Sequence, residues 1–256
     1  MAAAMSSAQP LLMGLLSDQP LATADLTWVE STGSTNADLV NDLASNHASA
    51  WSIRIATKQS HGRGRQGRSW ESPTGSIPVS IAVPLDEFTP APTWLSAITA
   101  IALRNAIREF IAEPISIKWP NDCLIANQKF AGILIERHNN FAVVGVGINF
   151  FGAPDLPTAT HLNLAKYLPA LAKFIHELIF QVQQAAKLTN DQLRQQIAAE
   201  LTTLGQLVEV ELTDGAKIIG VAKALTDSGG LVLATEAAEI EVIAGDVNHL
   251  RSAHAS

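Results

Sequence analysis

The first hydrophobic runs of the chain are short and rich in β-branched residues. Each run is bounded by glycine, proline or polar residues, which is typical of β-strands. We therefore expect strands at residues 27–30, 53–57 and 77–83, and we expect Pro84 to end the third.

Two other segments of the first half have helical character. Between residues 93 and 112 the apolar side chains recur mostly at helical spacing, which predicts an amphipathic helix. Earlier in the chain, Thr35 and Asp38 stand three residues apart, in the pattern of a capping box. A helix is therefore expected to begin there, soon after the first strand.

The middle of the chain is rich in predicted strands. Its apolar runs are separated by pairs of turn-forming residues such as Asn121–Asp122 and Asn139–Asn140. Consecutive strands with short turns predict an antiparallel sheet. The expected strands are 115–119, 123–126, 129–136 and 141–150. Helices are expected after them at about 160–187 and 189–203, with Pro169 breaking or kinking the first.

The pattern changes after Gly205. Apolar residues alternate with glutamate from Val208 to Leu212, and Asp214–Gly215 is a hairpin signal. Ser228–Gly230 marks another turn, and two more strand runs follow it, at 231–235 and 239–243. Short strands at this spacing predict a small β-barrel. The chain is therefore expected to divide into residues 1–203 and 204–256, with residues 1–20 loosely ordered.

Composition narrows the class of protein. The 256 residues carry a formal net charge of -7, which argues against a protein that coats nucleic acid. Cys123 is the only cysteine, so an internal disulfide and a cysteine-based metal cluster are excluded. No lysine or arginine precedes Arg54, and no long uncharged apolar segment occurs, so neither a signal peptide nor a membrane span is expected. These features favour a cytoplasmic protein.

Against this acidic background, the segment Gly62–Arg68 contains three glycines and three arginines. Arginine offers a planar fork of donors that suits carboxylate or phosphate. Glycine allows the backbone to approach a ligand closely. The segment lacks the Gly-Lys-Ser/Thr ending of a P-loop. It is expected to hold an anion, although a solvated basic loop or an RNA-binding patch would have the same composition.

Four further features are compatible with a ligand site, and each also has a structural explanation. The residues Ser34–Asn36 could bind a small polar ligand or cap a helix. The segment Lys118–Asp122 could serve phosphate or metal chemistry or simply form a turn. Lys129, three residues before Gly132, could neutralise a carboxylate or phosphate, or lie exposed at a strand start. Asn149 could contact a ligand or end its strand.

In their order along the chain, these segments resemble the biotin–protein ligases (biotin–[acetyl-CoA-carboxylase] ligases). The residues that carry the resemblance are Ser34–Asn36, Gln59–Trp70, Lys118–Asp122, Lys129–Leu134 and Gly145–Asn149. The resemblance covers about residues 27–150 in motif detail, and the tail from residue 205 resembles the family's C-terminal barrel. It implies an α+β fold related to class II aminoacyl-tRNA synthetases and lipoate ligases. In that fold a mixed, largely antiparallel sheet with flanking helices forms the catalytic domain, and a small SH3-like β-barrel follows it.

The resemblance also implies an activity. Biotin and ATP, with Mg²⁺, would give biotinyl-5′-AMP, and the biotinyl group would then pass to one lysine of a biotin carboxyl carrier domain of a carboxylase. Because only about 26 residues precede the first expected strand, and none of them is lysine or arginine, we expect a ligase that binds no DNA. Its oligomeric state is left open between a monomer and a homodimer. A lipoate–protein ligase is the nearest alternative, and a nucleic-acid-binding module that uses the arginine-rich loop is an alternative of another class.

The resemblance assigns roles to individual residues. Lys129, Arg63 and Arg65 would bring the biotin carboxylate and the α-phosphate together, and Asp122 would orient or deprotonate the acceptor lysine. Trp70 and Asn149 would contact the nucleotide, and Lys118 would assist with phosphates. The full set of expected binding residues is Ser34, Thr35, Asn36, Gln59, Arg63, Gly64, Arg65, Arg68, Trp70, Lys118, Asn121, Lys129, Gly132 and Asn149.

One stretch of the chain differs from the family pattern, and one loop is expected to move. The stretch Gly75–Ser80 is shorter than the corresponding family pattern and contains Pro78. The loop Gly62–Arg68 combines like charges with glycines, so we expect it to be mobile without ligand and to order when the adenylate binds.

Overall fold

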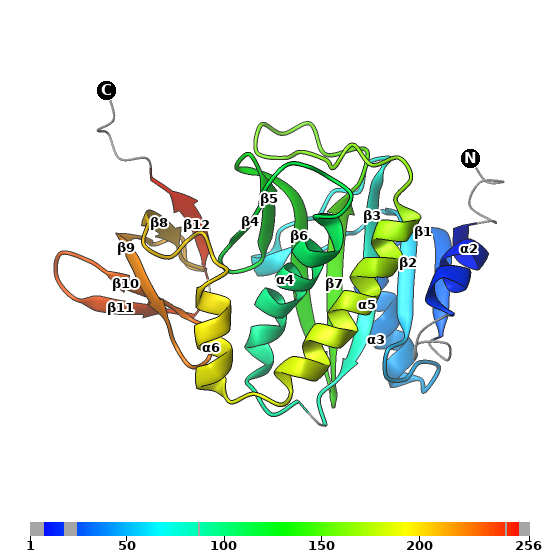
Figure 1. The fold of residues 1–256 in the computed structure, drawn as a ribbon, viewed down its shortest axis with the longest axis horizontal. Helices are drawn as coiled ribbons and strands as arrows, with labels where there is room; N and C mark the ends of the chain where they lie inside the picture. The colour runs from blue at the N-terminus through cyan, green and yellow to red at the C-terminus, as the bar shows by residue number, and fades with distance from the viewer. Residues whose placement is uncertain (1–7, 18–24, 87, 244, 251–256) are drawn as a thin grey trace.

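The computed structural model describes residues 8–17, 25–86, 88–243 and 245–250 (Figure 1). A seven-stranded sheet lies at its centre, and a five-stranded sheet formed by the C-terminal residues lies at one end. The strands of the larger sheet are β1 (Leu26–Thr32), β2 (Ile53–Gln59), β3 (Ser76–Pro84), β4 (Ile115–Lys118), β5 (Asp122–Ile125), β6 (Gln128–His138) and β7 (Phe141–Asn149).

The larger sheet is mixed but largely antiparallel, as the sequence predicts. Its strand order is β1-β2-β3-β7-β6-β5-β4, and only β1 and β2 run parallel to each other. Parallel neighbours need a crossover connection, and here the helix α3 (Thr35–Ala44) supplies it. The α+β fold class is confirmed.

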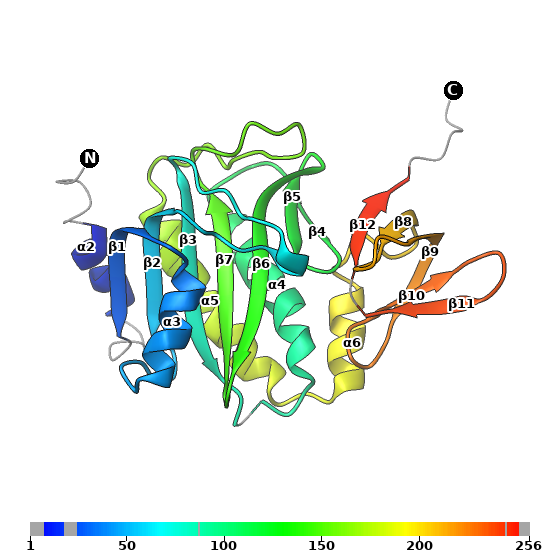
Figure 2. The same ribbon diagram turned by 180° about the vertical axis from the view of Figure 1, so that it is seen from behind.

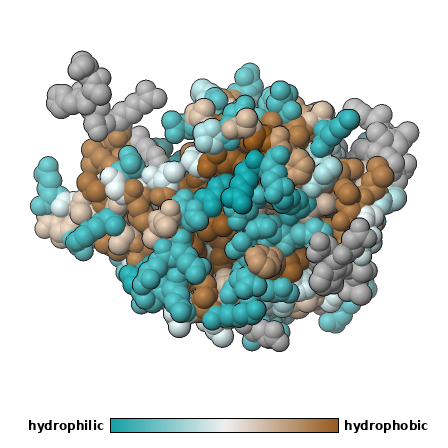
Figure 3. Space-filling model, viewed as in Figure 1, coloured by the Kyte–Doolittle hydropathy of each residue, from teal (hydrophilic) through white to brown (hydrophobic). Residues whose placement is uncertain are grey.

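Helices cover both faces of this sheet. The helices α4 (Leu95–Ile107) and α5 (Leu168–Ala185) lie over one face, and α2 (Ala8–Leu16) lies beside β1 (Figure 1). From this side the surface carries bands of hydrophilic side chains with smaller hydrophobic areas between them (Figure 3). Among the described residues, α3 and the long connection between β2 and β3 lie over the opposite face (Figure 2).

Side-chain alternation makes the two faces different. In β3, Ile77, Val79 and Ile81 belong to the main hydrophobic core, while Pro78 and Ser80 point to the opposite side. β7 follows the same rule, because Val144 and Ile148 are buried in the core while its glycines face away from it. The face that carries α3 is therefore the one left free to form a cleft.

The C-terminal residues form a separate antiparallel sheet of order β11-β10-β9-β8-β12. This C-terminal unit consists of β8 (Leu207–Glu211), β9 (Lys217–Leu225), β10 (Leu231–Ala234), β11 (Glu239–Val242) and β12 (Asp246–His249). Two tryptophans hold it: Trp94 donates its Nε1–H to the carbonyl of Asp227 at 3.1 Å, and Trp119 donates to that of Gly229 at 2.9 Å. The predicted small C-terminal β-unit is confirmed.

The predicted capping box at Thr35 and Asp38 is wrong. Ser34 is the N-cap of α3, because its side chain accepts from the backbone N–H of Ala37. The carboxylate of Asp38 instead accepts from the hydroxyl of Thr32 at 2.6 Å. The expected motif fails because a tertiary acceptor role competes for that carboxylate.

The helices are shorter than the sequence predicts. The segment 160–167 is not helical, and α5 begins at Leu168 with Pro169 in its first turn, where the missing N–H of proline needs no partner. The helix expected at 93–112 is α4, preceded by a 3₁₀ turn at Pro92–Trp94. The next helix is α6 (Asn190–Ala198), which begins with a true capping box between Thr189 and Gln192.

The first 20 residues are partly ordered, contrary to the expectation of a loose segment. Residues 8–16 form α2, and its Leu12 and Leu16 are buried in the main core. The remaining part of that expectation lies outside the described residues. Within the described ranges, no helix has the length and apolar character needed to cross a membrane.

Candidate active site

A cleft of about 1090 Å³ lies on the face of the sheet that carries α3. The N-terminus of α3, the β2–β3 connection, β6, β7 and the C-terminal unit all contribute to its walls. Every site residue predicted from the sequence lines it: Ser34, Thr35, Asn36, Gln59, Arg63, Gly64, Arg65, Arg68, Trp70, Lys118, Asn121, Asp122, Lys129, Gly132 and Asn149. Motifs that are far apart in the sequence therefore meet at one place.

Three glycines form the floor of this cleft. A Cβ at Gly145 would lie 2.2 Å from Oδ1 of Asn36, and one at Gly147 would lie 2.2 Å from the indole of Trp70. A Cβ at Gly132 would lie 2.8 Å from the side chain of Lys129. The glycines of β6 and β7 are thus needed because side chains from other elements lie directly on the sheet.

The arginine-rich loop is a tight hairpin. The N–H of Trp70 donates to the carbonyl of Gly62 at 2.8 Å, and Arg63 pairs with Ser69. A Cβ at Gly62 would lie 2.3 Å from the Trp70 carbonyl oxygen. Glycine at this position therefore allows close approach of the loop's own backbone, whereas the sequence reasoning had expected approach by a ligand.

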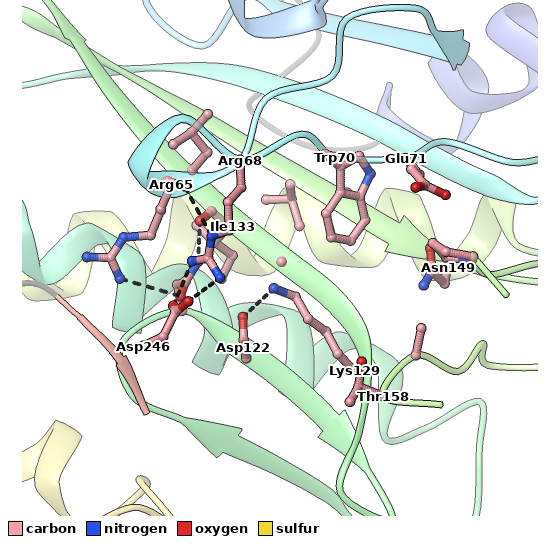
Figure 4. Close-up of a pocket in the computed structure, with 18 of the residues that line it drawn as sticks. Arg65, Arg68, Trp70, Glu71, Asp122, Lys129, Ile133, Asn149, Thr158 and Asp246 are labelled. Carbon is pink, nitrogen blue, oxygen red and sulfur yellow. Dashed lines mark hydrogen bonds and ion pairs between the residues drawn. The ribbon is translucent and has the colours of Figure 1, made fainter. Parts of the chain in front are cut away.

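Two acidic residues and one amide hold the three arginines of the loop. Arg63 donates to Glu136 at 3.0 Å. Arg68 forms a two-pronged pair with Asp246 of β12, with one contact of 2.6 Å (Figure 4). The guanidinium of Arg65 lies 3.5 Å from Oδ1 of Asn121.

Burial in the cleft lowers the pKa of the Arg65 guanidinium, while the carboxylates of Asp246 and Asp122 act to raise it. Arginine pKa values start so high that Arg65 stays charged at physiological pH. A permanent positive charge is therefore held in a partly desolvated position, where its attraction for an anion is strong.

Lys129 lies at the centre of the cleft (Figure 4). Its Nζ is 2.5 Å from Oδ1 of Asp122 and 5.6 Å from the centre of the Trp70 ring. Lys118 approaches the other oxygen of Asp122 at 3.5 Å. The backbone of Lys129 bonds to that of Thr158 and Thr160, which brings the segment after β7 to the edge of the cleft. One carboxylate thus orients two ammonium groups toward the same space.

A network of polar side chains occupies the end of the cleft at α3. Gln59 accepts through Oε1 from both the N–H and the hydroxyl of Thr35, at 2.8 Å and 3.0 Å. The hydroxyl of Ser80 lies 2.6 Å from Oδ1 of Asn36, and Nδ2 of Asn36 donates to Glu136 at 2.8 Å. The side chains of Thr35, Asn36 and Ser80 are buried, so this end is a fixed polar surface.

Two buried polar atoms of described residues in the cleft have neither a hydrogen-bond partner nor an ion-pair partner. They are Nε1 of Trp70, a donor, and Oδ1 of Asn149, an acceptor. The amide nitrogen of Asn149 is held by the carbonyl of Thr160 at 3.0 Å, which fixes the free oxygen in place. Unpartnered buried polar atoms are costly, so these two are suited to contact a bound ligand.

Other kinds of chemistry find little support in the described part of the chain. No group of three histidine, cysteine, aspartate or glutamate side chains there could hold a metal ion. Cys123 is fully buried, and burial raises the pKa of its thiol to about 12, which makes it inert as a nucleophile.

Three residues around the cleft were missed by the sequence reasoning: Ser80, Glu136 and Asp246. Glu136 and Ser80 could have been found, because strand alternation puts them on the face that also carries Gly132 and Gly145. Asp246 carries no local signal, since it meets Arg68 only through the docking of the C-terminal unit.

Comparisons with known proteins match most of this chain. A model of the biotin/lipoate A/B protein ligase family matches residues 28–149, and a model of the biotin protein ligase C-terminal domain matches residues 203–250. The chain is 36% identical to a biotin–[acetyl-CoA-carboxylase] ligase of Mycobacterium tuberculosis over 88% of its own length and 89% of the relative's. A ligase of the same name from Paracoccus denitrificans is 37% identical to this chain. That match covers 48% of this chain and 54% of the length of the Paracoccus ligase.

Solved structures show the same likeness. The biotin protein ligase of Aquifex aeolicus in complex with biotin and ATP superposes with a TM-score of 0.75 at 26% identity, covering 89% of this chain and 99% of that chain.

Proposed function

The chain belongs to the family of biotin–[acetyl-CoA-carboxylase] ligases, and from this membership we propose that its cleft attaches biotin to a lysine of a carboxyl carrier domain. The reaction takes place in two steps. Biotin and ATP give biotinyl-5′-AMP and pyrophosphate, and the acceptor lysine then displaces AMP. The observation that carries this proposal is the convergence of the arginine-rich loop, Lys129 and the polar end at α3 on one cleft.

In the first step two anions must meet, because the biotin carboxylate attacks the α-phosphate of ATP. Lys129, Arg63 and Arg65 offset the repulsion between these groups and stabilise the charge that develops on the phosphorus oxygens. The partial desolvation of Arg65 supports this role, since its charge acts there in a less polar medium than water. Lys118 and Arg68 contribute further positive charge for the phosphates.

The polar end of the cleft at α3 binds the ring system of biotin. Ser34, Thr35, Asn36 and Gln59 offer the hydroxyls and amides that suit a cyclic urea. The other end of the cleft binds the nucleotide, and the unpartnered atoms of Trp70 and Asn149 support this division. An adenine ring stacks on the indole of Trp70 and can donate its amino group to Oδ1 of Asn149.

In the second step Asp122 acts on the acceptor lysine. Its carboxylate already binds the ammonium groups of Lys129 and Lys118, which supports an affinity for a third ammonium at the same position. Orienting the acceptor amine, and accepting its proton, lets nitrogen attack the carbonyl carbon of the mixed anhydride while AMP leaves.

ATP enters as its magnesium complex. The described residues offer no cluster of metal ligands, and Asp122 is engaged by lysine, so we assign the magnesium ion to the substrate rather than to the protein.

We further propose that residues 1–203 form the catalytic domain and residues 204–256 a small accessory domain. We propose the cytoplasm as the location, and a monomer or homodimer that binds no DNA.

Biotin transfer to a carrier domain tests this proposal. The chain is incubated with biotin, Mg-ATP and a purified carrier domain, and the carrier is weighed by mass spectrometry. We expect a gain equal to biotin minus water, which disappears when ATP is omitted or when the acceptor lysine is replaced by arginine. No gain with any biotin-dependent carrier from the same organism would contradict the proposal.

A further inference from the structure

We propose that Glu136, a residue outside the expected binding set, is a positioning residue that fixes which way the amide of Asn36 faces and so sets the specificity of the cleft for a cyclic urea. This inference rests on the proposed function, because it concerns the end of the cleft that we assign to biotin. Glu136 lies on β6, on the same face of the sheet as Gly132.

One carboxylate oxygen of Glu136 makes two contacts. Oε2 accepts from Nδ2 of Asn36 at 2.8 Å and from the guanidinium of Arg63 at 3.0 Å. The Glu136 side chain retains 27% of its exposure, while Asn36 retains only 4%. The carboxylate therefore stands at the boundary between the buried polar end of the cleft and the arginine-rich loop.

The charge of Glu136 determines the orientation of Asn36. On its other side, Asn36 meets the hydroxyl of Ser80 at 2.6 Å, and a hydroxyl can either donate or accept. An ionised carboxylate can only accept. If the amide were flipped, Oδ1 would face the carboxylate without a proton between them, whereas Ser80 would tolerate either orientation. Glu136 is thus the group that excludes the flipped state.

A fixed orientation matters for recognition. With Nδ2 against Glu136 and Oδ1 against Ser80, Asn36 has one N–H and one lone pair left for a ligand, in a set order. A cyclic urea carries a carbonyl between two N–H groups, so it can match that order from one side. Gly145 supports the same arrangement, because any side chain there would collide with Oδ1 of Asn36.

The second contact of Glu136, with Arg63, connects the biotin end of the cleft to the arginine-rich loop. Arg63 stands near the start of the hairpin, and its pairing with Glu136 holds the loop beside the polar end of the cleft. The Glu136 carboxylate therefore orients two groups that we assign to biotin. Asn36 binds the ring of biotin, and Arg63 binds its carboxylate.

Replacement of Glu136 by glutamine tests this inference. Glutamine has the same shape, but its amide can donate to a flipped Asn36. We expect E136Q to weaken biotin binding about tenfold, which is the size of effect expected when a hydrogen bond to a charged group no longer fixes the amide of Asn36. The KM for ATP should change less than twofold, because Glu136 contacts neither Trp70 nor Asn149 and glutamine can still accept from Arg63. Biotin affinity is measured by calorimetry, and both KM values by pyrophosphate release.

Two variants serve as comparisons. E109Q breaks the ion pair of Glu109 with Lys173, away from the cleft, and should change neither constant. E136D keeps a group that only accepts, one methylene further back, so it should bind biotin more tightly than E136Q and gives a second test if E136Q does not fold.

The outcomes separate this inference from the proposed function. If the wild-type chain forms no biotinyl-AMP, the proposed function fails. If the wild type is active but E136Q leaves biotin affinity unchanged, weakens biotin and ATP equally, or matches E136D, then Glu136 does not position Asn36 and the inference alone is overturned.

Discussion

The ammonium group of Lys129 is held in a fixed position in the cleft by its neighbours. It lies 2.5 Å from a carboxylate oxygen of Asp122 and above the indole of Trp70. The carboxylate and the ring hold the ammonium group in place by an ion pair and a cation–π contact. A lysine held in this way is a fixed positive charge that needs little reorganisation when an anion arrives.

Removing this charge should stop the first step. We expect K129A to reduce the rate of adenylate formation about 100-fold to 1000-fold, in line with the loss of one preorganised group that stabilises developing charge. Single-turnover formation of biotinyl-AMP, quenched and measured by mass spectrometry, gives the rate. The matched control is K173A, which removes a lysine paired with Glu109. An unchanged rate in K129A would remove Lys129 from the site.

At the scale of residues, the sequence predicted many residues of the cleft, although no single motif was sufficient to assign them to a ligand site. Ser34, Lys118 and Asn149 each also had a structural explanation, and only their order along the chain favoured a ligand site. The structure brings them to one cleft. Glu136 and Asp246 escaped notice because an isolated acidic residue on a strand carries no motif, and its importance depends on the arginine that the fold brings to it.

At the scale of elements, the cleft depends on glycines in two adjacent strands. Gly132 and Gly147 stand opposite each other on β6 and β7, and the indole of Trp70 lies over both. The tight hairpin Gly62–Trp70 delivers this indole to the sheet, and its Gln66 and Gly67 adopt the left-handed backbone conformation at the tip. The loop and the sheet therefore form one wall.

Filling the glycine floor should displace the tryptophan. In G147A the new Cβ would lie 2.2 Å from the indole, so Trp70 must move. We expect the KM for ATP to rise about tenfold, as for the loss of a base-stacking platform. Steady-state kinetics measure this change, and tryptophan fluorescence reports whether the indole has moved. The control G14A meets no atom within 4 Å. A normal KM for ATP in G147A would show that Trp70 does not contact the nucleotide.

The elements themselves were predictable to different degrees. The strands of the central sheet followed from β-branched runs and turn residues, because those signals are local. The start of α3 was misassigned by one residue, since Asp38 bonds to Thr32 of a neighbouring strand. The segment 160–167 is not helical as predicted, because the backbone of Thr160 bonds to Lys129 and that of Leu162 bonds to Asn149. Tertiary contacts decided these two cases, and no local pattern reports them.

At the scale of the whole molecule, the C-terminal unit forms part of the cleft. The Asp246 carboxylate holds Arg68 across a sequence separation of 178 residues, and Gln206, Val247 and Asn248 also line the cleft. Trp94 and Trp119 fix the unit in this position through the turn after β9. The arginine-rich loop is thus held at one end by the central sheet, through Glu136, and at the other by the C-terminal unit.

Weakening the link to the C-terminal unit should have a modest effect that depends on salt. D246N keeps a hydrogen-bond acceptor but removes the charge. We expect kcat/KM for ATP to fall about threefold to fivefold, since partly exposed ion pairs contribute at most about 1 kcal/mol. The difference from wild type should shrink in 1 M salt, which screens exposed charges. The control E209Q breaks the pair between Glu209 and Lys217 within the same unit. A deficit that persists unchanged at high salt would contradict an electrostatic link.

We propose that this cleft joins the carboxylate of biotin to the α-phosphate of ATP. The most direct test is to incubate the chain with Mg-ATP and either biotin or lipoate, without any acceptor, and to identify the acyl-adenylate by mass spectrometry. The arrangement of Asn36, Glu136 and Lys129 predicts biotinyl-AMP with biotin and none with lipoate. Formation of lipoyl-AMP without biotinyl-AMP would contradict the account.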